Sequence, residues 1–157
     1  MPNTIHEADS KTVGNRVMTE AWSPQSWRGL PIRQVPGYPN EAAGALIGRV
    51  AGPDHEVTEF RGMRNTITDR PWDRYAIDPL EELRVQKDAE SRGLEIIGFA
   101  HSHPDHPPIP SRFDADHGWS FYSYVVASVQ KGTLREARSW RLDERGVFQE
   151  EPLTETA

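Results

Sequence analysis

The stretch 78–101 sets the strongest limits on the architecture of this chain. Asp78 followed by Pro79 combines an N-cap residue with a proline at the first helical position, so a helix is predicted over 79–92. Gly93 provides the left-handed stop of that helix, and the apolar segment 94–101 predicts a buried central strand. A helix that leads directly into a buried strand indicates a domain in which helices cover a sheet.

Further strands are predicted on both sides of this unit. The segments 45–51 and 56–60 flank a Gly-Pro-Asp turn and predict a hairpin of two antiparallel strands. A second helix is predicted to begin near Ser111, and three more strands are predicted over 122–129, 139–142 and 146–148. This order predicts an α+β domain over 41–157, α/β/α-like, with a central mixed β-sheet flanked by helices.

The first forty residues follow a different pattern. Five prolines interrupt them, and no window keeps a helical or strand period, so residues 1–40 are predicted to form an irregular Pro-rich N-terminal arm. Trp22 and Trp27 are costly to leave in water, which predicts that part of the arm lies against an apolar surface.

Composition excludes several classes of function. The 157 residues contain no cysteine, which excludes disulfides, thiolate metal sites and a cysteine nucleophile, so any metal must be held by His, Asp or Glu. The net charge of −6 argues against a wide basic surface for nucleic acid, and no apolar run is long enough for a membrane span or a signal peptide. We expect one cytoplasmic domain with no nucleic-acid or membrane partner.

The densest chemistry lies directly after the predicted central strand. His101 and His103 are two residues apart, so both imidazoles point to the same side if the strand continues through them. Ser111 and Asp114 share one face of a helical turn, and the seven residues before Ser111 can fold that face back over the strand end. Two imidazoles and one carboxylate are three ligands for a tetrahedral zinc ion with a fourth position open for water, as in catalytic sites.

Each half of this pattern also has a simpler explanation. An H-x-H pair arises by chance in roughly one chain in four of this length and histidine content. A serine followed by an acid three residues later is also a capping-box pattern, which needs no metal. The run 101–106 additionally matches the H-x-H-x-D-H pattern of metallo-β-lactamase-like hydrolases, but that fold needs metal ligands far downstream, and no histidine follows His117.

Taken together, His101-Ser102-His103 and Ser111-Arg112-Phe113-Asp114 resemble the JAMM motif of MPN-domain zinc metallopeptidases. The bacterial members carry an upstream glutamate in a segment similar to Tyr38–Gly48 of this chain, and the match falls on Glu41. The resemblance covers about residues 38–152. It implies a JAMM/MPN fold, which is cytidine-deaminase-like, with Zn²⁺ as cofactor. It also implies His101, His103 and Asp114 as metal ligands, with Glu41 and Ser111 as catalytic residues.

The same resemblance implies a reaction and a substrate class. Zinc-bound water would hydrolyse the bond after the C-terminal Gly-Gly of a ubiquitin-like protein, in bacteria a ThiS- or MoaD-type sulfur carrier. Glu41 would take and return the proton, and the Ser111 hydroxyl would stabilise the developing oxyanion. Ser102, His106 and His117 are expected to contact substrate or orient the ligands. The alternative is a non-catalytic MPN binding or scaffold module, in which the metal only stabilises a docking surface.

The chain departs from the family pattern before the glutamate. In the family a long amphipathic helix leads into this position, whereas Pro31, Pro36 and Pro39 exclude a helix here. Ala43 also stands where many relatives have cysteine, at a position that is not a ligand. The segment 22–39 instead resembles the N-terminus of class II DAHP synthases, but it carries none of their catalytic residues, so it implies no synthase activity.

Overall fold

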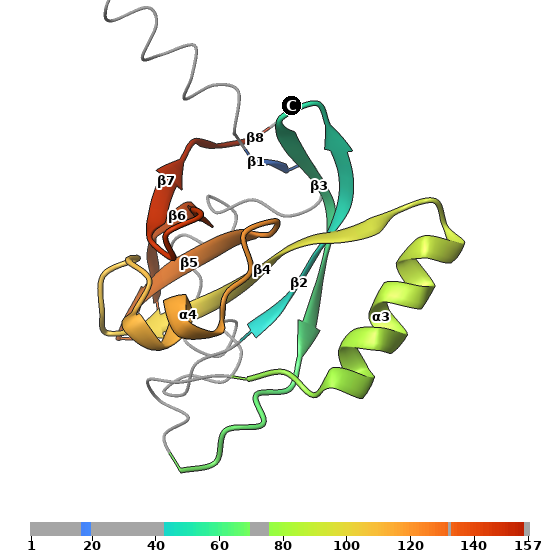
Figure 1. Cartoon of the computed structure of the whole chain (residues 1–157). Coiled ribbons are helices and arrows are strands. Elements are labelled where there is room, and N and C mark those ends of the chain that lie inside the picture. The colour runs from blue at the N-terminus through green and yellow to red at the C-terminus, as the bar shows by residue number, and fades with distance from the viewer. Residues whose placement is uncertain (1–16, 20–42, 70–75, 132, 156–157) are drawn as a thin grey trace, which may run out of the picture.

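The structure, a computed structural model, describes residues 17–19, 43–69, 76–131 and 133–155. Two helices lie within these ranges, α3 (Pro79–Ser91) and α4 (Arg112–His117). The strands are β1 (Val17–Thr19), β2 (Ala43–Ala51), β3 (Asp54–Met63), β4 (Glu95–Pro104), β5 (Ser123–Gln130), β6 (Thr133–Leu142), β7 (Phe148–Glu151) and β8 (Leu153–Glu155) (Figure 1). Neither described helix has the length and apolar character that crossing a membrane requires.

The predicted hairpin, helix and central strand are all present. β2 and β3 pair antiparallel around a turn in which Gly52 has φ 60°. The Asp78 carboxylate accepts a hydrogen bond from the Leu80 N–H at 3.0 Å and so caps α3, and Gly93, with φ 73°, follows its end. Several boundaries differ from the predicted ones. β6 already begins at Thr133, β7 begins only at Phe148, and β3 and β4 continue to Met63 and Pro104.

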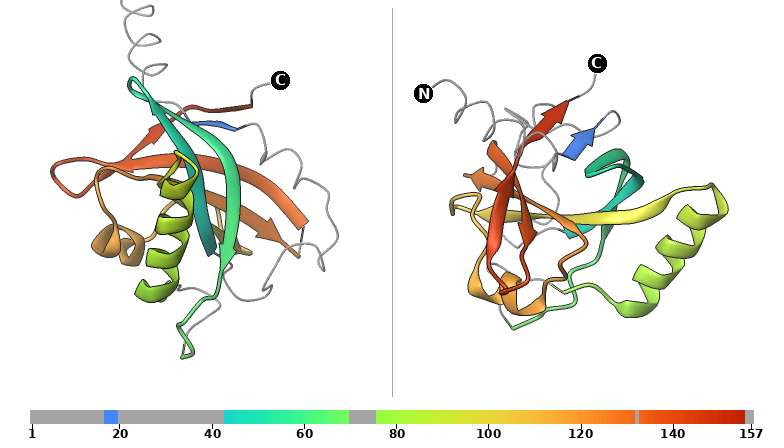
Figure 2. Two further views of the ribbon diagram at one scale, coloured as in Figure 1. Left: turned by 90° about the vertical axis from the view of Figure 1, so that its right-hand side faces the viewer. Right: turned by 45° about the horizontal axis from the view of Figure 1, so that its top comes forward.

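The strands form one mixed sheet in the order β7-β6-β5-β4-β2-β3-β1-β8. β4 and β5 are parallel, as are β1 with β3 and β1 with β8. The order places β7 and β8 at opposite ends, yet only Pro152 separates them in the chain. The sheet is therefore strongly curled, so that its two edges approach each other (Figure 2).

The strands β1 and β8 were not predicted, because three residues carry too little period to identify a strand. β1 lies inside the segment expected to be irregular, and it joins the curled sheet between β3 and β8. The rest of the arm lies outside the described residues, and so do the Trp22 and Trp27 side chains and the segment 22–39.

Curling gives the sheet two apolar faces. On the concave face, Leu153 of β8 packs against a cluster from the central strands, made of Leu46, Val57, Ile97, Ala100 and Val125. On the convex face, α3 buries Val85 and Ala89 against a second cluster that includes Phe99 and Tyr124. A cavity lined by Phe99 and Tyr124 reaches both α3 and α4, so the two described helices lie over this same convex face.

A buried polar cluster joins distant strands on the concave side. The His55 Nδ1 lies 2.8 Å from the Ser123 hydroxyl, which donates to Glu151 Oε1 at 2.7 Å. Ser139 donates to the same oxygen at 2.9 Å, and Arg141 Nε lies 2.7 Å from Glu151 Oε2. These groups come from β3, β5, β6 and β7, so they can form their hydrogen bonds and ion pair only because the sheet is curled.

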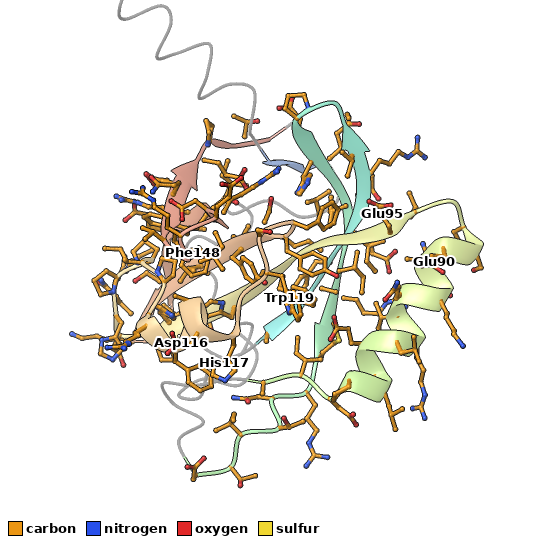
Figure 3. The ribbon with its side chains drawn as sticks, in the orientation of Figure 1. Glu90, Glu95, Asp116, His117, Trp119 and Phe148 are labelled. Atoms are coloured by element: carbon orange, nitrogen blue, oxygen red, sulfur yellow. The ribbon has the colours of Figure 1, made fainter. Side chains whose placement is uncertain are left out.

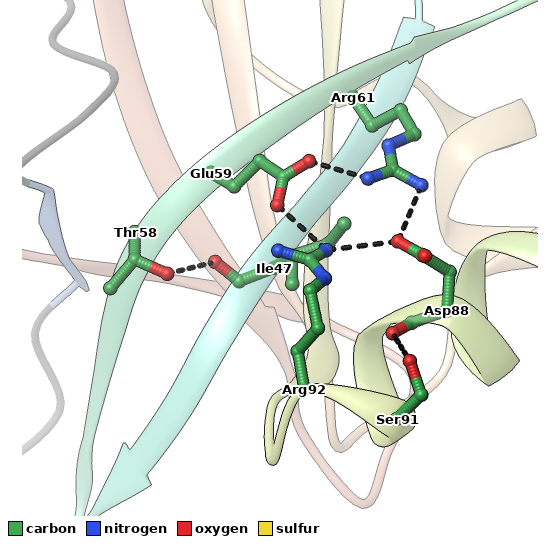
Figure 4. A network of polar contacts seen from close by, with 7 residues as sticks. All are labelled: Ile47, Thr58, Glu59, Arg61, Asp88, Ser91 and Arg92. Carbon is green, nitrogen blue, oxygen red and sulfur yellow. Dashed lines mark hydrogen bonds and ion pairs between the residues drawn. The ribbon is translucent and has the colours of Figure 1, made fainter.

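Ion pairs at the surface hold α3 against β3 (Figure 4). Arg61 of β3 lies 3.0 Å from Asp88 of α3, and Arg92 lies 2.8 Å from Glu59 of β3. The four side chains are partly exposed to water, so each pair contributes little to stability. Together with the apolar packing, these ion pairs help to fix the position of α3 relative to β3.

Candidate metal centre

The two histidines of the motif stand on one face of β4. The strand runs through His101 and His103 to Pro104, as the sequence predicts, and it is held in register by β5 on one side. Because alternate side chains of a strand share a face, both imidazoles project the same way, and their Nε2 atoms are 3.0 Å apart. Both residues are buried.

The helix α4 brings a carboxylate over this pair. Asp114 Oδ2 lies 3.3 Å from His101 Nε2 and 3.4 Å from His103 Nε2. An ion with tetrahedral geometry and ligand distances of 2.0–2.2 Å separates its ligand atoms by about 3.3 Å, so these spacings suit one shared ion. Among the residues that the structure describes, this is the one group of three His, Asp or Glu side chains that converges closely enough to hold a metal.

Ser111 and Asp114 form the capping box, and the box itself aims the carboxylate. The Ser111 N–H donates to Asp114 Oδ2 at 2.7 Å, and the Asp114 N–H donates to Ser111 Oγ at 3.1 Å. Asp114 Oδ2, which faces the two histidines, is thus the same oxygen that accepts the hydrogen bond from the Ser111 N–H. The structural and the metal-binding explanations of this motif are therefore compatible. The Ser111 oxygen is an acceptor in the box, so its own proton is available to a further acceptor.

Three side chains donate hydrogen bonds to carbonyl groups of the segment between the histidines and α4. His103 Nδ1 donates to the Pro107 carbonyl at 3.0 Å, which leaves the lone pair on Nε2, where a metal would bind. Ser128 donates to the His106 carbonyl at 2.5 Å, and Trp140 Nε1 donates to the Pro108 carbonyl at 3.1 Å. Ser128 and Trp140 were not predicted, since they come from β5 and β6 and no local pattern links them to the motif.

The electrostatics favour the ligand forms of these side chains. Burial lowers the pKa of His101, although the nearby Asp114 carboxylate opposes this shift. Burial alone would raise the pKa of Asp114, but His101, His103 and the Ser111 N–H together hold it well below its usual value. At neutral pH the site therefore offers a neutral imidazole from His101 and an ionised carboxylate, as a metal requires.

The other predicted site residues lie in different surroundings. Ser102 is buried but follows His101 by one residue, so it belongs to the opposite face of β4. His106 and His117 are exposed, and His117 stacks on Phe113, with ring centres 4.1 Å apart, while its Nδ1 donates to the Phe113 carbonyl at 2.8 Å. The roles of these three residues remain predictions.

Glu41 lies outside the described residues. Two residues further along the chain, Ala43 of β2 is paired with His101 of β4. The described chain thus enters the sheet beside the first histidine of the motif.

The metallo-β-lactamase-like alternative requires Asp105 to act together with the histidines. Asp105 instead has φ 57°, and its Oδ1 accepts a hydrogen bond from the Lys131 N–H at 2.8 Å. Its carboxylate therefore holds the turn between β5 and β6, and it does not belong to the converging group.

Comparisons with known proteins agree with the geometry. A profile described as "Prokaryotic homologs of the JAB domain" matches residues 32–143. The chain is 33% identical to a desampylase of Haloferax volcanii over 68% of this chain and 73% of that protein, and 30% identical to a desampylase of Pyrococcus furiosus over 81% and 84%. It is also 32% identical to a probable TtuB-protein conjugate cleaving protease of Thermus thermophilus, over 56% and 55%.

The fold is shared with solved structures. The solution structure of a protein from Desulfitobacterium hafniense superposes with a TM-score of 0.72 and 27% identity over 90% of this chain and 92% of that one. The expected JAMM/MPN-type fold is thereby confirmed. The profile covers well over half of the chain, and the chain therefore belongs to the prokaryotic homologs of the JAB domain.

Proposed function

We propose that the protein is a zinc-dependent isopeptidase that hydrolyses the bond after the C-terminal Gly-Gly of a ubiquitin-like or sulfur-carrier protein. The observation that carries this proposal is the convergence of His101 Nε2, His103 Nε2 and Asp114 Oδ2 within 3.4 Å of one another. Three ligands leave one tetrahedral position open, and an open position is the feature that separates catalytic from structural zinc sites.

The donor set fits zinc. Two imidazole nitrogens and a carboxylate oxygen are common zinc ligands, and the His103–Pro107 hydrogen bond orients one imidazole as in other metal sites. When bound, the zinc ion would lower the pKa of a coordinating water molecule to about 7 and would polarise a substrate carbonyl.

Two further side chains complete the proposed chemistry. Glu41 takes the proton of the attacking water and passes it to the leaving amine. This role is supported by the motif and by the pairing of Ala43, which is two residues from Glu41 in the sequence, with the proposed ligand His101. The Ser111 hydroxyl donates a hydrogen bond to the oxygen of the scissile carbonyl and keeps its proton. Its own oxygen accepts from the Asp114 N–H, which leaves the O–H free to point at the substrate.

The substrate class is supported by the relatives. Two are named desampylases, and a third is named as a probable protease that cleaves TtuB–protein conjugates. We infer that this chain likewise acts on a small protein carrier conjugated through its C-terminus. An extended Gly-Gly tail fits such a site because it can bind through main-chain hydrogen bonds in a narrow slot.

The proposal is tested by metal content and cleavage in parallel. Purified protein should hold about one zinc ion per chain, and His103→Ala or Asp114→Ala should abolish this binding. Glu41→Gln should keep the zinc but lose cleavage of a carrier whose Gly-Gly is linked to a lysine of a second protein. Glu144→Gln, which removes an exposed acid, is the matched control and should keep both. Wild-type protein that binds zinc but cleaves no such conjugate would favour the non-catalytic binding module instead.

A further inference from the structure

A cavity of about 170 Å³ opens between α3 and α4, directly beside the metal centre. Asp114 forms part of its wall, so the cavity adjoins the proposed position of the reacting bond. The remaining wall comes from both helices, from the strands below them, and from the segments that precede α3 and follow α4. These residues are Ala76, Ile77, Glu82, Phe99, Phe113, His117, Trp119 and Tyr124.

The cavity combines aromatic rings with acids. Four of its residues, Phe99, Phe113, Trp119 and Tyr124, present aromatic side chains, and none of the lysines and arginines that the structure describes lines it. Trp119 is 70% exposed, so its ring stands at the surface instead of filling the core (Figure 3). The Trp119 N–H donates to the Tyr124 hydroxyl at 2.8 Å, which holds the backbone of this wall in place.

Glu82 gives the cavity a negative charge that no cation among the described residues balances. Its carboxylate lines the cavity, and within the described residues it makes no hydrogen bond or ion pair. Burial raises the pKa of this carboxyl, as expected for an acid that is withdrawn from water without a cation beside it. An apolar guest would bury the carboxylate further, whereas a cationic guest would compensate it.

We propose that this cavity binds a lysine or arginine side chain of the substrate close to the bond that is cleaved. The inference rests on the proposed isopeptidase function and adds to it a preference for substrate sequence. The aliphatic stem of such a side chain packs on the rings, its cation lies over an aromatic face, and its charge pairs with Glu82. Because Asp114 belongs to both the cavity and the metal centre, a side chain held here places its own backbone beside the reacting carbonyl.

Binding is tested without catalysis by titrating the zinc-loaded protein with blocked single residues. The probes are the N-acetyl methylamides of lysine, norleucine and glutamate, and the readout is the NMR shift of the Trp119 indole N–H. Lysine should bind at least about fivefold more tightly than norleucine, which has the same stem without the charge, and glutamate should bind most weakly. Glu82→Gln should reduce the preference for lysine to less than about twofold.

Glu81→Gln is the matched control, since it removes the same charge from the same turn of α3 but does not line the cavity. It should keep the full preference. Equal binding of lysine and norleucine, no binding of either, or a preference that survives Glu82→Gln would each overturn the proposal.

Cleavage adds an independent test. In Gly-Gly conjugates that carry lysine or norleucine at each position next to the conjugated lysine, lysine at one of these positions should raise kcat/KM in wild type but not in Glu82→Gln. Zinc content should be equal in both proteins. Cleavage without such a preference would overturn this inference alone, whereas loss of all cleavage with intact lysine binding would overturn the proposed function.

Discussion

Replacing His55 with glutamine should make the stability of the protein less sensitive to acid. His55 is 2% exposed, and its Nδ1 bonds to Ser123 within the polar cluster that closes the curled sheet. Burial, followed by the positive charge of Arg141, lowers the pKa of His55 to about 4. The folded protein therefore holds this histidine in the neutral form.

The magnitude follows from the linkage between protonation and folding. A pKa that falls from 6.5 in the unfolded chain to about 4 in the folded one corresponds to about 3 kcal/mol at 1.36 kcal/mol per unit. Between these two values the unfolded state binds more protons than the folded state. The contribution is thus complete above pH 6.5 and is lost as the pH falls towards 4.

The assay is urea unfolding of wild type and His55→Gln at several pH values from 7.5 to 3.5. The difference in unfolding free energy between the two proteins should shift by about 3 kcal/mol over this range, in favour of the variant at low pH. Burial raises the pKa of Glu151, which has the opposite effect on the pH dependence, but this group is present in both proteins and cancels. A difference that stays constant with pH would refute the reasoning.

Three further substitutions test other parts of the structure. Gly98→Ala would make its added Cβ clash with the Ser123 carbonyl oxygen of β5, so the variant should lose about 3 kcal/mol of unfolding free energy, measured with heat or urea. Gly62→Ala is the control, because nothing lies within 4 Å of its added Cβ, and its unfolding free energy should stay within about 0.5 kcal/mol of wild type. Ser111→Ala should cost about 1 kcal/mol of stability through the lost cap but about 100-fold or more in kcat, and a loss of stability with unchanged kcat would contradict the oxyanion role. Trp140→Phe removes the hydrogen bond to the Pro108 carbonyl and should weaken zinc affinity about tenfold, measured by competition with a chelator, whereas unchanged affinity would show that this bond does not position the loop.

The sequence predicts those parts of the site that depend on local periodicity. The spacing of His101 and His103 places both side chains on one face of a strand, and the capping pattern of Ser111 and Asp114 places a carboxylate at a helix start. The structure shows that both local rules operate and that the loop between them closes the group. The capped helix α3 and the central strand β4 are predicted for the same reason, since their signals lie within the segments themselves.

The remaining features depend on contacts between distant segments. His55 and Ser123 are 68 residues apart, and Ser123 and Glu151 are 28 apart, so no window of sequence shows that they share a cluster. The closure of the sheet depends on the very short strands β1 and β8. Likewise, Glu82 and Trp119 line one cavity only because α3 and α4 lie over the same face of the sheet. Such features follow from the tertiary fold and not from local pattern.

The most direct test of the central claim is a crystal structure of the zinc-loaded protein with an anomalous difference map at the zinc edge. One strong peak is expected within about 2.0–2.2 Å of His101 Nε2, His103 Nε2 and an Asp114 oxygen, with a fourth position facing solvent. A peak that is absent, or that is held by other residues such as His106 or His117, would contradict it.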